Sequence, residues 1–191
     1  LNGAREKAKA MNCTSNLRQT GLAAMSYMSD TGCMVPHQKF TVALAGNSFP
    51  AYLVYNYGLS AKIIDCPNNP GGRKSKIPLY PVTGANVNYF WEYPDFGFNM
   101  RLSLAKHIAR SSQKVLYADV AWDKTSSVGT SGSCFVSQSP NSNGMLAPRH
   151  NRFKVVNILW ADGHFAGYAT PLDGNTQVGR DILYSAAHLG T

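Results

Sequence analysis

The sequence predicts an α+β protein in which a long amino-terminal α-helix packs on an antiparallel β-sheet with long loops. Two features support this prediction. The first 30 of the 191 residues contain no proline and are rich in the helix formers Ala, Leu, Met, Lys, Arg and Gln. Residues 155–168 hold two apolar runs around the turn-forming pair Asp162-Gly163, a pattern typical of a β-hairpin. We therefore expect a helix over residues 1–30 and a globular head over residues 31–191.

The predicted helix spans about residues 2–28 and ends at the turn-forming sequence Asp30-Thr31-Gly32. Apolar residues recur along it at three- and four-residue steps, which places them in rows on the helix surface. One row contains Leu1, Ala4, Ala8, Met11, Leu22, Met25 and Met28, and the row beside it contains Cys13, Leu17, Ala24 and Tyr27. The second half of the helix thus has a broad apolar face that requires a sheet to cover it.

The first half of the helix is small and basic. Arg5, Lys7 and Lys9 are opposed only by Glu6, so these turns have little to bury. One interpretation is a solvated helix start, because runs of charge are usually solvated. The other is that a membrane-spanning segment precedes Leu1, because Lys and Arg are enriched beside such segments.

Three strands are expected in the second half of the chain. They cover residues 114–122, residues 155–160 and residues 164–168. The second is apolar on both faces, which indicates a central strand that is covered on both sides. Asp162-Gly163 favours a two-residue type I′ turn between the last two strands, because glycine tolerates a positive φ.

The remaining segments carry weaker signals. Residues 31–95 contain seven prolines and predict a long, irregular connection. Residues 125–143, rich in Ser, Gly and Thr, predict a loop. The other expected elements are a helix or strand over residues 49–57, strands over 62–66 and 86–91, a helical turn over 102–108, and an amphipathic segment over 179–189.

Charged residues make up 15% of the chain, and the net charge of +8 is scattered along it. A nucleic-acid-binding protein clusters its positive charge on one face with aromatic residues, so no nucleic-acid partner is expected. The many Asn, Ser, Thr, Gly and Tyr residues are typical of an exported protein with ordered loops. No stretch reaches the roughly 18 consecutive apolar residues of a membrane-spanning helix, and no signal peptide is visible.

The chain has four cysteines, Cys13, Cys33, Cys66 and Cys134. No C-x-x-C pair and no histidine at zinc-finger spacing accompanies them, so a zinc site is not expected. An even number of cysteines is compatible with two disulfides in three possible pairings, and also with four reduced, buried thiols.

Several blocks of the sequence resemble, in the same order, the prepilin-like proteins of bacterial secretion and pilus systems. These blocks are residues 4–9 (AREKAK), 13–23 (CTSNLRQTGLA), 65–67 (DCP), 96–99 (FGFN), 114–119 (KVLYAD), and Arg149-His150 followed by residues 157–164 (NILWADGH). Many members of that family carry a carboxy-terminal His-x9-Asp-Gly motif, whereas 11 residues separate His150 from Asp162 here. Thr20 also stands where the family usually has a large aliphatic residue.

The resemblance implies a structural role, not an enzyme: a pseudopilin or minor pilin of a type II secretion or type IV pilus-like assembly. A prepilin peptidase trims such a subunit. A hydrophobic helix segment, here expected before Leu1, anchors it in the inner membrane, and its head lies in the periplasm or outside the cell. The implied partners are other pilin-like subunits, the secretion machinery and the membrane.

The same resemblance assigns roles to individual residues. Small helix residues such as Gly3 would let neighbouring helices approach closely, and the basic ones would face acidic headgroups or acidic partners. The expected assembly residues are Leu1, Ala4, Arg5, Lys7, Ala8, Lys9 and Met11. Export further implies disulfides, with Cys13 paired to Cys66 because both lie in family-like blocks, which leaves Cys33 with Cys134.

A structural explanation suffices for the hairpin motif of His150, Asp162, Gly163 and His164, because Asp-Gly suits a tight turn and such histidines usually bond the backbone. No cofactor or catalytic residue is therefore expected. One alternative gathers Asp119, His150 and Asp162, with Asp123 as a further candidate, around a Ca²⁺ ion, which prefers six to eight oxygen ligands.

Two other functions stay open. A metal-dependent hydrolase would use Asp119, His150 and Asp162, with a serine from residues 126–139 as nucleophile. An exported carbohydrate- or protein-binding module would use aromatic loop residues, since the chain has ten tyrosines and three tryptophans.

Overall fold

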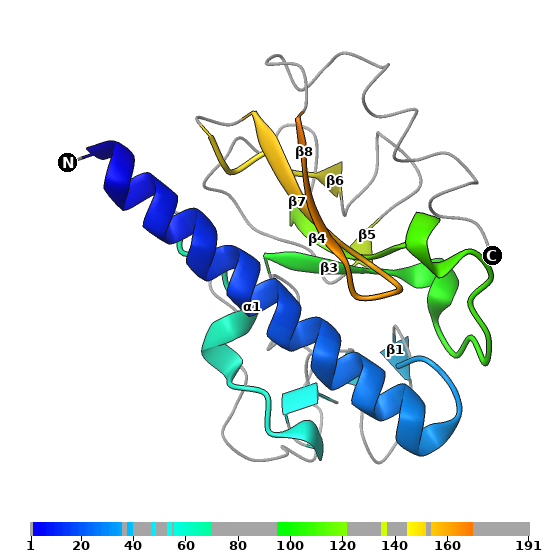
Figure 1. Ribbon diagram of the computed structural model, residues 1–191. Helices are drawn as coiled ribbons and strands as arrows, with labels where there is room; N and C mark the ends of the chain where they lie inside the picture. Colours follow the sequence, from blue (N-terminus) through cyan, green and yellow to red (C-terminus); the bar gives the residue numbers. More distant parts are fainter. Residues whose placement is uncertain are drawn as a thin grey trace.

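The computed structural model describes residues 2–35, 38–39, 47–48, 53–54, 56–69, 95–121, 135–136, 145–151 and 154–169 (Figure 1). One long helix lies across one face of a mainly antiparallel sheet, which confirms the predicted α+β class. The elements are α1 (Asn2–Thr31), β1 (Gln38–Lys39), β2 (Asn47–Ser48), the 3-10 helix η2 (Ala61–Ile64), β3 (Phe96–Asn99), the 3-10 helices η4 (Met100–Leu102) and η5 (Ser111–Gln113), β4 (Val115–Ala121), β5 (Phe135–Val136), β6 (Met145–Leu146), β7 (Val155–Trp160) and β8 (Phe165–Ala169).

The main sheet has the strand order β5-β3-β4-β7-β8, and β6 pairs with β4 beside this path. β3, β4, β7 and β8 pair antiparallel with their neighbours, whereas β5 runs parallel to β3. β7 is central as predicted, because Ile158 pairs with Ala118 on one side and with Ala166 on the other. β1 and β2 form a separate two-stranded sheet.

Both faces of the sheet are buried. On the face toward α1 the core contains Phe96, Phe98, Leu116, Tyr117 and Leu159, together with Cys13, Leu17 and Ala24 of the helix. On the opposite face it contains Val115, Ala118, Val120, Val136, Val156, Ile158 and Trp160. Burial on both faces explains why β7 is apolar at every position except Asn157 instead of alternating.

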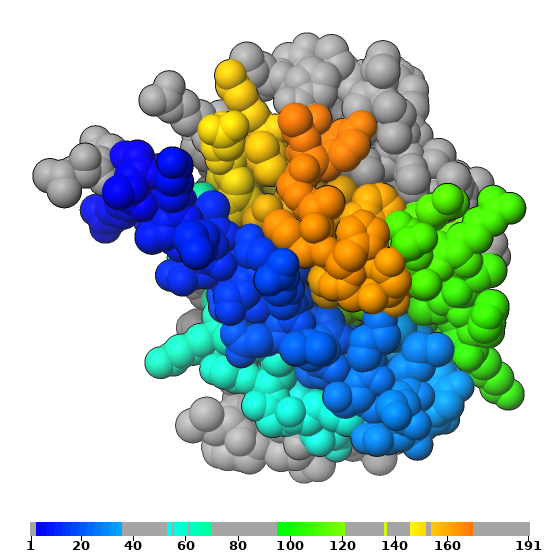
Figure 2. All heavy atoms as spheres, in the orientation of Figure 1, coloured from blue at the N-terminus to red at the C-terminus, as the bar shows by residue number. Residues whose placement is uncertain are grey.

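The two predicted apolar rows of α1 are buried to different extents, and in the less buried row Met25 and Met28 are partly buried against the core. Cys13, Leu17 and Ala24 are fully buried, whereas Met11 and Leu22 of the other row are 72% and 69% exposed. The expectation that the broad apolar face is covered is therefore wrong at Leu22. Residues 3–8 are exposed as well, so the first turns bury little, as predicted. Figure 2 shows α1 running across the face of the molecule between residues 53–69 and the β7–β8 hairpin.

Two small or polar helix residues permit this docking. The hydroxyl of buried Thr20 donates to the carbonyl of Asn16 (3.0 Å), so a polar residue is accommodated inside the helix–sheet contact. Gly21 lies against Leu159, and a Cβ at that position would overlap the leucine side chain. The helix ends at Gly32, which has a positive φ of 72° and donates its N–H to Met28 (2.9 Å), an arrangement that terminates many helices.

Two short elements differ from the prediction. The expected strand over residues 62–66 is instead η2, which begins after Ser60, whose hydroxyl accepts from the N–H of Lys62. The expected helical turn over residues 102–108 is limited to η4, because Leu104 has a left-handed φ of 58° that a helix cannot continue. Residues 53–54 and 56–57 are helical within the segment predicted as helix or strand.

The β7–β8 turn also differs from the prediction. Trp160 donates its N–H to the carbonyl of His164, and Gly163 donates to the carbonyl of Trp160, both at 2.9 Å. Of the loop residues 161–163 only Gly163 has a positive φ (89°), whereas a type I′ turn requires two such residues. The connection is therefore a longer loop that ends on a left-handed glycine.

No helix in the described part of the chain combines the length and apolar character needed to cross a membrane. The expected strand over residues 86–91, the loop over residues 125–143 except residues 135–136, and the amphipathic segment over residues 179–189 lie outside the described residues.

Candidate functional site

Polar side chains gather inside the protein where α1 meets the sheet. Each is at most 8% exposed, although charged and amide side chains are rarely buried unless they are paired. We call the group the buried polar cluster: Asn68, Asn69, Asp95, Asp119, Arg149, His150 and Asn157, with the disulfide between Cys13 and Cys66 at its edge. Its members come from α1, the loop after η2, the start of β3, β4, the segment before β7, and β7 itself.

Asp95 binds three parts of the cluster. One carboxylate oxygen accepts the N–H of Cys66 (2.7 Å), and the other accepts the side-chain amide of Asn69. Arg149 approaches the carboxylate to 3.4 Å and also donates to the carbonyls of Asp95 (2.9 Å) and Val120. This buried ion pair ties the loop after η2 to the edges of β3 and β4, and the carbonyls satisfy donors that the carboxylate does not reach.

Asp119 and His150 form the centre of the cluster. Asp119 Oδ2 accepts the N–H of Asn157 (2.7 Å) and lies 3.3 Å from His150 Nε2. His150 is held by its backbone, which exchanges hydrogen bonds with Val155 at 3.1 and 3.0 Å. The short loop between them includes Asn151 with a left-handed φ of 49°.

The neighbours of His150 define its tautomer. The Asn68 side-chain nitrogen lies 3.3 Å from the carbonyl of Arg149, which can only accept, so this nitrogen is a donor. The same nitrogen lies 3.1 Å from His150 Nδ1, which must then accept. His150 therefore carries its proton on Nε2 and directs it toward Asp119 Oδ2, while Cys66 Sγ lies 3.7 Å from the same nitrogen.

The disulfide joins Cys13 of α1 to Cys66, with Cα atoms 5.3 Å apart, as the resemblance implied. Beside it, Asn16 donates its side-chain amide to the carbonyl of Asp65 (3.2 Å). The second expected disulfide, Cys33 with Cys134, involves a residue outside the described part of the chain, within which Cys33 is a free, half-buried thiol.

A second histidine–aspartate pair lies at the surface, in the β7–β8 turn. Asp162 Oδ1 lies 2.6 Å from His164 Nδ1 and accepts the N–H of His164 (3.0 Å). The His164 ring stacks on Trp160, with ring centres 5.4 Å apart. Partial burial alone would raise the pKa of Asp162, but the hydrogen bonds and charge of His164 outweigh it and lower this pKa below its ordinary value.

The structure separates the residues proposed for a calcium or hydrolase site. Asp119 and His150 come together, but Asp162 does not join them. The N–H of Ala161 donates to the carbonyl of Lys114, which precedes Asp119 by five residues along the chain. At about 3.3 Å per strand residue, Asp162 therefore follows a position roughly 15 Å from Asp119. Asp123 and almost all of the serine loop over residues 126–139 lie outside the described residues. His150, Asp162, Gly163 and His164 are likewise not one site, because they belong to the two separate pairs.

Sequence reasoning missed most of the polar partners in the cluster. Arg149 was noted only as part of a matching block, and Asp95, Asn68, Asn69 and Asn157 were not singled out. Their types and spacing carry no motif, since they come from four separate segments. The one signal for such a buried polar residue is a charged residue directly beside an apolar run, such as Asp95 before Phe96.

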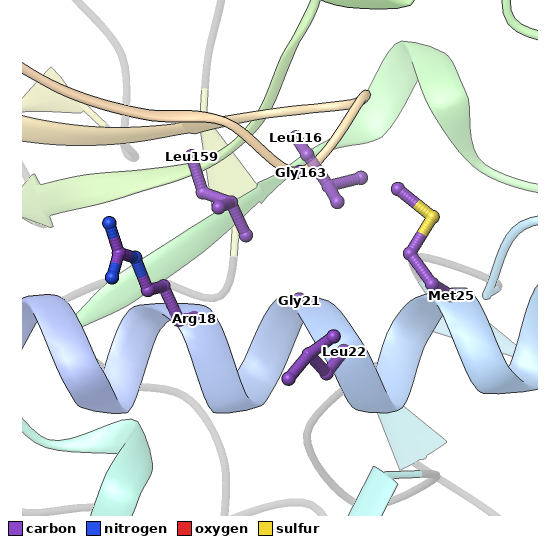
Figure 3. A pocket seen from close by; sticks show the side chains of 7 residues that line it. All are labelled: Arg18, Gly21, Leu22, Met25, Leu116, Leu159 and Gly163. Carbon is purple, nitrogen blue, oxygen red and sulfur yellow. The ribbon is translucent and has the colours of Figure 1, made fainter.

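An apolar pocket of about 140 Å³ lies between α1 and the β7–β8 turn. Figure 3 shows Arg18 and Met25 reaching toward the hairpin on either side of Gly21, which lies against Leu159. The Arg18 guanidinium lies 5.6 Å from the centre of the Phe165 ring and closes one end. Leu22, also at the rim, is largely exposed, so this region continues the outer apolar row of α1.

Among the aromatic loop residues that the binding-module alternative would use, the structure describes Tyr57. Tyr57 packs against Tyr27 with ring centres 5.7 Å apart and donates to Asp30 (2.9 Å). Burial of the side chain is the main cause that raises the pKa of both tyrosines above its ordinary value. Tyr52, Tyr55, Tyr80, Tyr89, Trp91 and Tyr93 lie outside the described residues.

Comparison with known proteins gives a match for the first third of the chain. No curated protein and no solved structure matches the chain. Residues 2–64, which contain α1 and η2, match the model of a family described as a protein of unknown function (DUF1559).

Proposed function

We propose that this protein is a pilin-like structural subunit, a pseudopilin or minor pilin of a type II secretion or type IV pilus-like assembly. In this proposal it is anchored at the inner membrane and its head lies outside the cytoplasm. The observation that carries the proposal is the partial docking of α1: one face is bonded to the head, while the first turns, Met11 and Leu22 are left exposed.

The exposed row has the geometry of a helix-packing surface. Ala4, Ala8, Met11 and Leu22 fall within a narrow stripe, because these positions differ by nearly whole turns at 3.6 residues per turn. All four are exposed. The stripe changes from small residues near the start to large apolar ones further along, so a neighbouring helix could approach closely there and bury Met11 and Leu22.

The charges around this stripe suit a membrane-proximal or subunit-facing position. Arg5 and Lys7 are exposed, and Lys9 forms an exposed ion pair with Glu6 (3.1 Å). Positive side chains beside the small residues would be attracted to acidic headgroups or to acidic residues of another subunit. The family match over residues 2–64 covers the whole of this helix.

A structural role also agrees with the chemistry of the buried polar cluster. Its histidine and aspartate are 3% and 0% exposed, so neither reaches a substrate in solution. The cluster instead bonds α1, β4, β7 and the loop after η2 together. We therefore propose that the protein is not an enzyme and that the cluster holds the head rigidly on the assembly helix.

Photo-crosslinking in cells that express the complete native gene tests this proposal. A benzophenone amino acid replaces Met11, which is 72% exposed on the outer row, or Met100, which is 41% exposed in η4 and serves as the matched control. We expect ultraviolet-dependent adducts between copies, or with other pilin-like subunits, from position 11 and not from position 100. Loss of the adducts in cells without prepilin peptidase would link them to assembly.

Two outcomes contradict the proposal. One is a folded protein that gives no adduct with itself or another pilin-like subunit at position 11. The other is equal labelling at both positions, which would indicate random collision of exposed methionine sites.

A further inference from the structure

Four side chains, two at the centre of the buried polar cluster and two at its edge, carry atoms that can bind a transition metal. We call them the quartet: Cys13, Cys66, Asp119 and His150. Their donor atoms all lie within 4.8 Å of one another, and no member is more than 3% exposed. We propose that the quartet binds one Zn²⁺ ion when the disulfide is reduced, so that a metal site and a disulfide are alternative states of the same place.

Two distances in the quartet agree with tetrahedral coordination, and the two sulfurs, which are now bonded to each other, would have to move apart on reduction. Zn²⁺ binds thiolate sulfur at about 2.3 Å and imidazole nitrogen or carboxylate oxygen at about 2.0–2.2 Å, so tetrahedral geometry puts the donors roughly 3.3–3.8 Å apart. His150 Nε2 lies 3.3 Å from Asp119 Oδ2 and 3.7 Å from Cys66 Sγ. Two sulfurs, one nitrogen and one oxygen complete four positions, which is the closed arrangement of a structural zinc site.

The surroundings of Asp119 are a second, independent observation. Asp119 Oδ1 is buried and has no hydrogen-bond partner within the described part of the chain. The guanidinium of Arg149 is engaged by Asp95, so His150 is the only basic side chain in ion-pair contact with Asp119 among the described residues. A buried carboxylate oxygen without a donor is costly, and a cation would satisfy it.

The change from disulfide to metal site balances as a two-electron reduction followed by proton release. A dithiol reductant gives two electrons and two protons to the disulfide: the S–S bond breaks, Cys13 and Cys66 become thiols, and the reductant closes to its own disulfide. Zn²⁺ then displaces the two thiol protons into solvent and forms two zinc–sulfur bonds. In the reverse direction a disulfide oxidant takes two electrons from the two thiolates and two protons from solvent and becomes a dithiol, the Cys13–Cys66 bond re-forms, and Zn²⁺ is released.

Metal binding requires one rearrangement around His150. Its Nε2 now carries the proton and must lose it to bind zinc, so the proton moves to Nδ1. Asn68 then has to turn its amide so that its oxygen accepts this proton, as the outer partners of metal-bound histidines usually do. Asn68 Oδ1 is buried and has no partner within the described residues, so it is available for this bond.

Cobalt spectroscopy on the complete purified chain tests the proposal. The protein is divided into an oxidised sample and one reduced with a dithiol, which is then removed without oxygen, and each is titrated with Co²⁺. We expect the reduced sample to take up one Co²⁺ per chain with sulfur-to-cobalt charge-transfer absorption and the intense visible bands of tetrahedral cobalt. Zn²⁺ should abolish these bands, and the oxidised sample should not show them.

Variants separate the quartet from other ligands. Asp119→Asn and His150→Gln leave both cysteines in place and should weaken Co²⁺ binding to the reduced chain at least about 100-fold, and Asn68→Ala about 10- to 100-fold. Cys33→Ser and His164→Gln, which remove the free thiol and the surface histidine, should bind as the unaltered chain does. Circular dichroism of the oxidised variants shows whether each has folded.

A measurement on the reduced, unaltered chain is enough to overturn the proposal, even where a variant does not fold. The absence of thiolate–cobalt absorption at millimolar Co²⁺ overturns it. So does a band that survives in folded Asp119→Asn and His150→Gln, or one that Cys33→Ser removes. A reduced chain that unfolds and does not regain its circular dichroism with Zn²⁺ overturns it as well.

Discussion

The described part of the chain holds two histidine–aspartate pairs, one at each end of β7, and their surroundings are opposite. His150 and Asp119 lie inside the buried polar cluster at most 3% exposed, whereas the side chains of His164 and Asp162 are 47% and 32% exposed in the β7–β8 turn. The surface pair even has the shorter contact, 2.6 Å against 3.3 Å. The contact distance alone therefore does not show which pair stabilises the fold more, because water competes with the surface pair and is excluded from the buried one.

The two pairs also differ in what they connect. Asp162 and His164 lie two residues apart and stabilise one turn. Asp119 and His150 join β4 to the segment before β7 and contact the disulfide that holds α1. Long-range partners make the buried pair part of the fold, and this difference sets the order of the effects expected from mutation.

Removal of the disulfide beside the buried pair should have the largest effect. The bridge closes a sequence separation of 53 residues, which corresponds to about 4 kcal/mol in the loop-entropy estimate, with 2–5 kcal/mol typical of native bridges. We expect Cys13→Ser with Cys66→Ser to lower the free energy of unfolding by that amount in urea titrations with chelator present. Cys33→Ser, the control, should change it by less than about 0.5 kcal/mol. A loss below about 1 kcal/mol in the double variant would show that packing alone holds α1.

Truncation of the buried aspartate should rank second. Asp119→Ala removes the acceptor of the Asn157 N–H and of the His150 ring, and each buried donor left without a partner costs about 1–3 kcal/mol. We expect a loss of about 2–4 kcal/mol in the free energy of unfolding at neutral pH. Asp162→Ala, its surface counterpart, should lose less than about 1 kcal/mol. Similar losses in the two variants would contradict the contrast between the pairs.

The surface pair should have the smallest effect, visible in acid. Because the folded pKa of Asp162 lies below its unfolded value of about 3.9, the carboxylate stabilises the fold fully above that value. This contribution is lost as the pH falls through the folded pKa. We expect the stability difference between the unaltered chain and Asp162→Asn to stay below about 1 kcal/mol, because the pair is partly exposed, and to shrink below about pH 4. Urea titrations from pH 3 to pH 6 measure it, and a difference that grows in acid would contradict the sign.

The strands that local signals define were predicted closely. Residues 155–160 were expected as a central strand and form β7, and residues 114–122 and 164–168 differ by one residue at each end from β4 and β8. The weak signals failed at residues 62–66 and 102–108, where side-chain caps and a left-handed Leu104 give 3-10 turns. Short apolar runs do not distinguish strand from helix, because so few residues carry no clear period.

The candidate site was predicted in part. Cys13 with Cys66 was expected from the resemblance, and Asp119 and His150 were grouped together correctly, but with Asp162, which lies near the other end of β7. Asp-Gly and a nearby histidine form an obvious motif in the sequence, and for this reason the predicted site includes the surface turn. Asp95 and Arg149 are more deeply bonded, yet no local pattern marks them, because their partners are distant in the chain.

Local sequence patterns are enough to predict the long helix, its small and basic start, and the alternation of apolar runs and turn residues that builds the sheet. These features depend on neighbours within a few residues, through helix periodicity, strand propensity and the conformations open to glycine. The packing of the helix on the strands sets which apolar row of α1 faces the sheet and which histidine–aspartate pair lies inside. Both depend on contacts between residues far apart in the chain, such as Cys13 with Cys66 and Cys66 with His150.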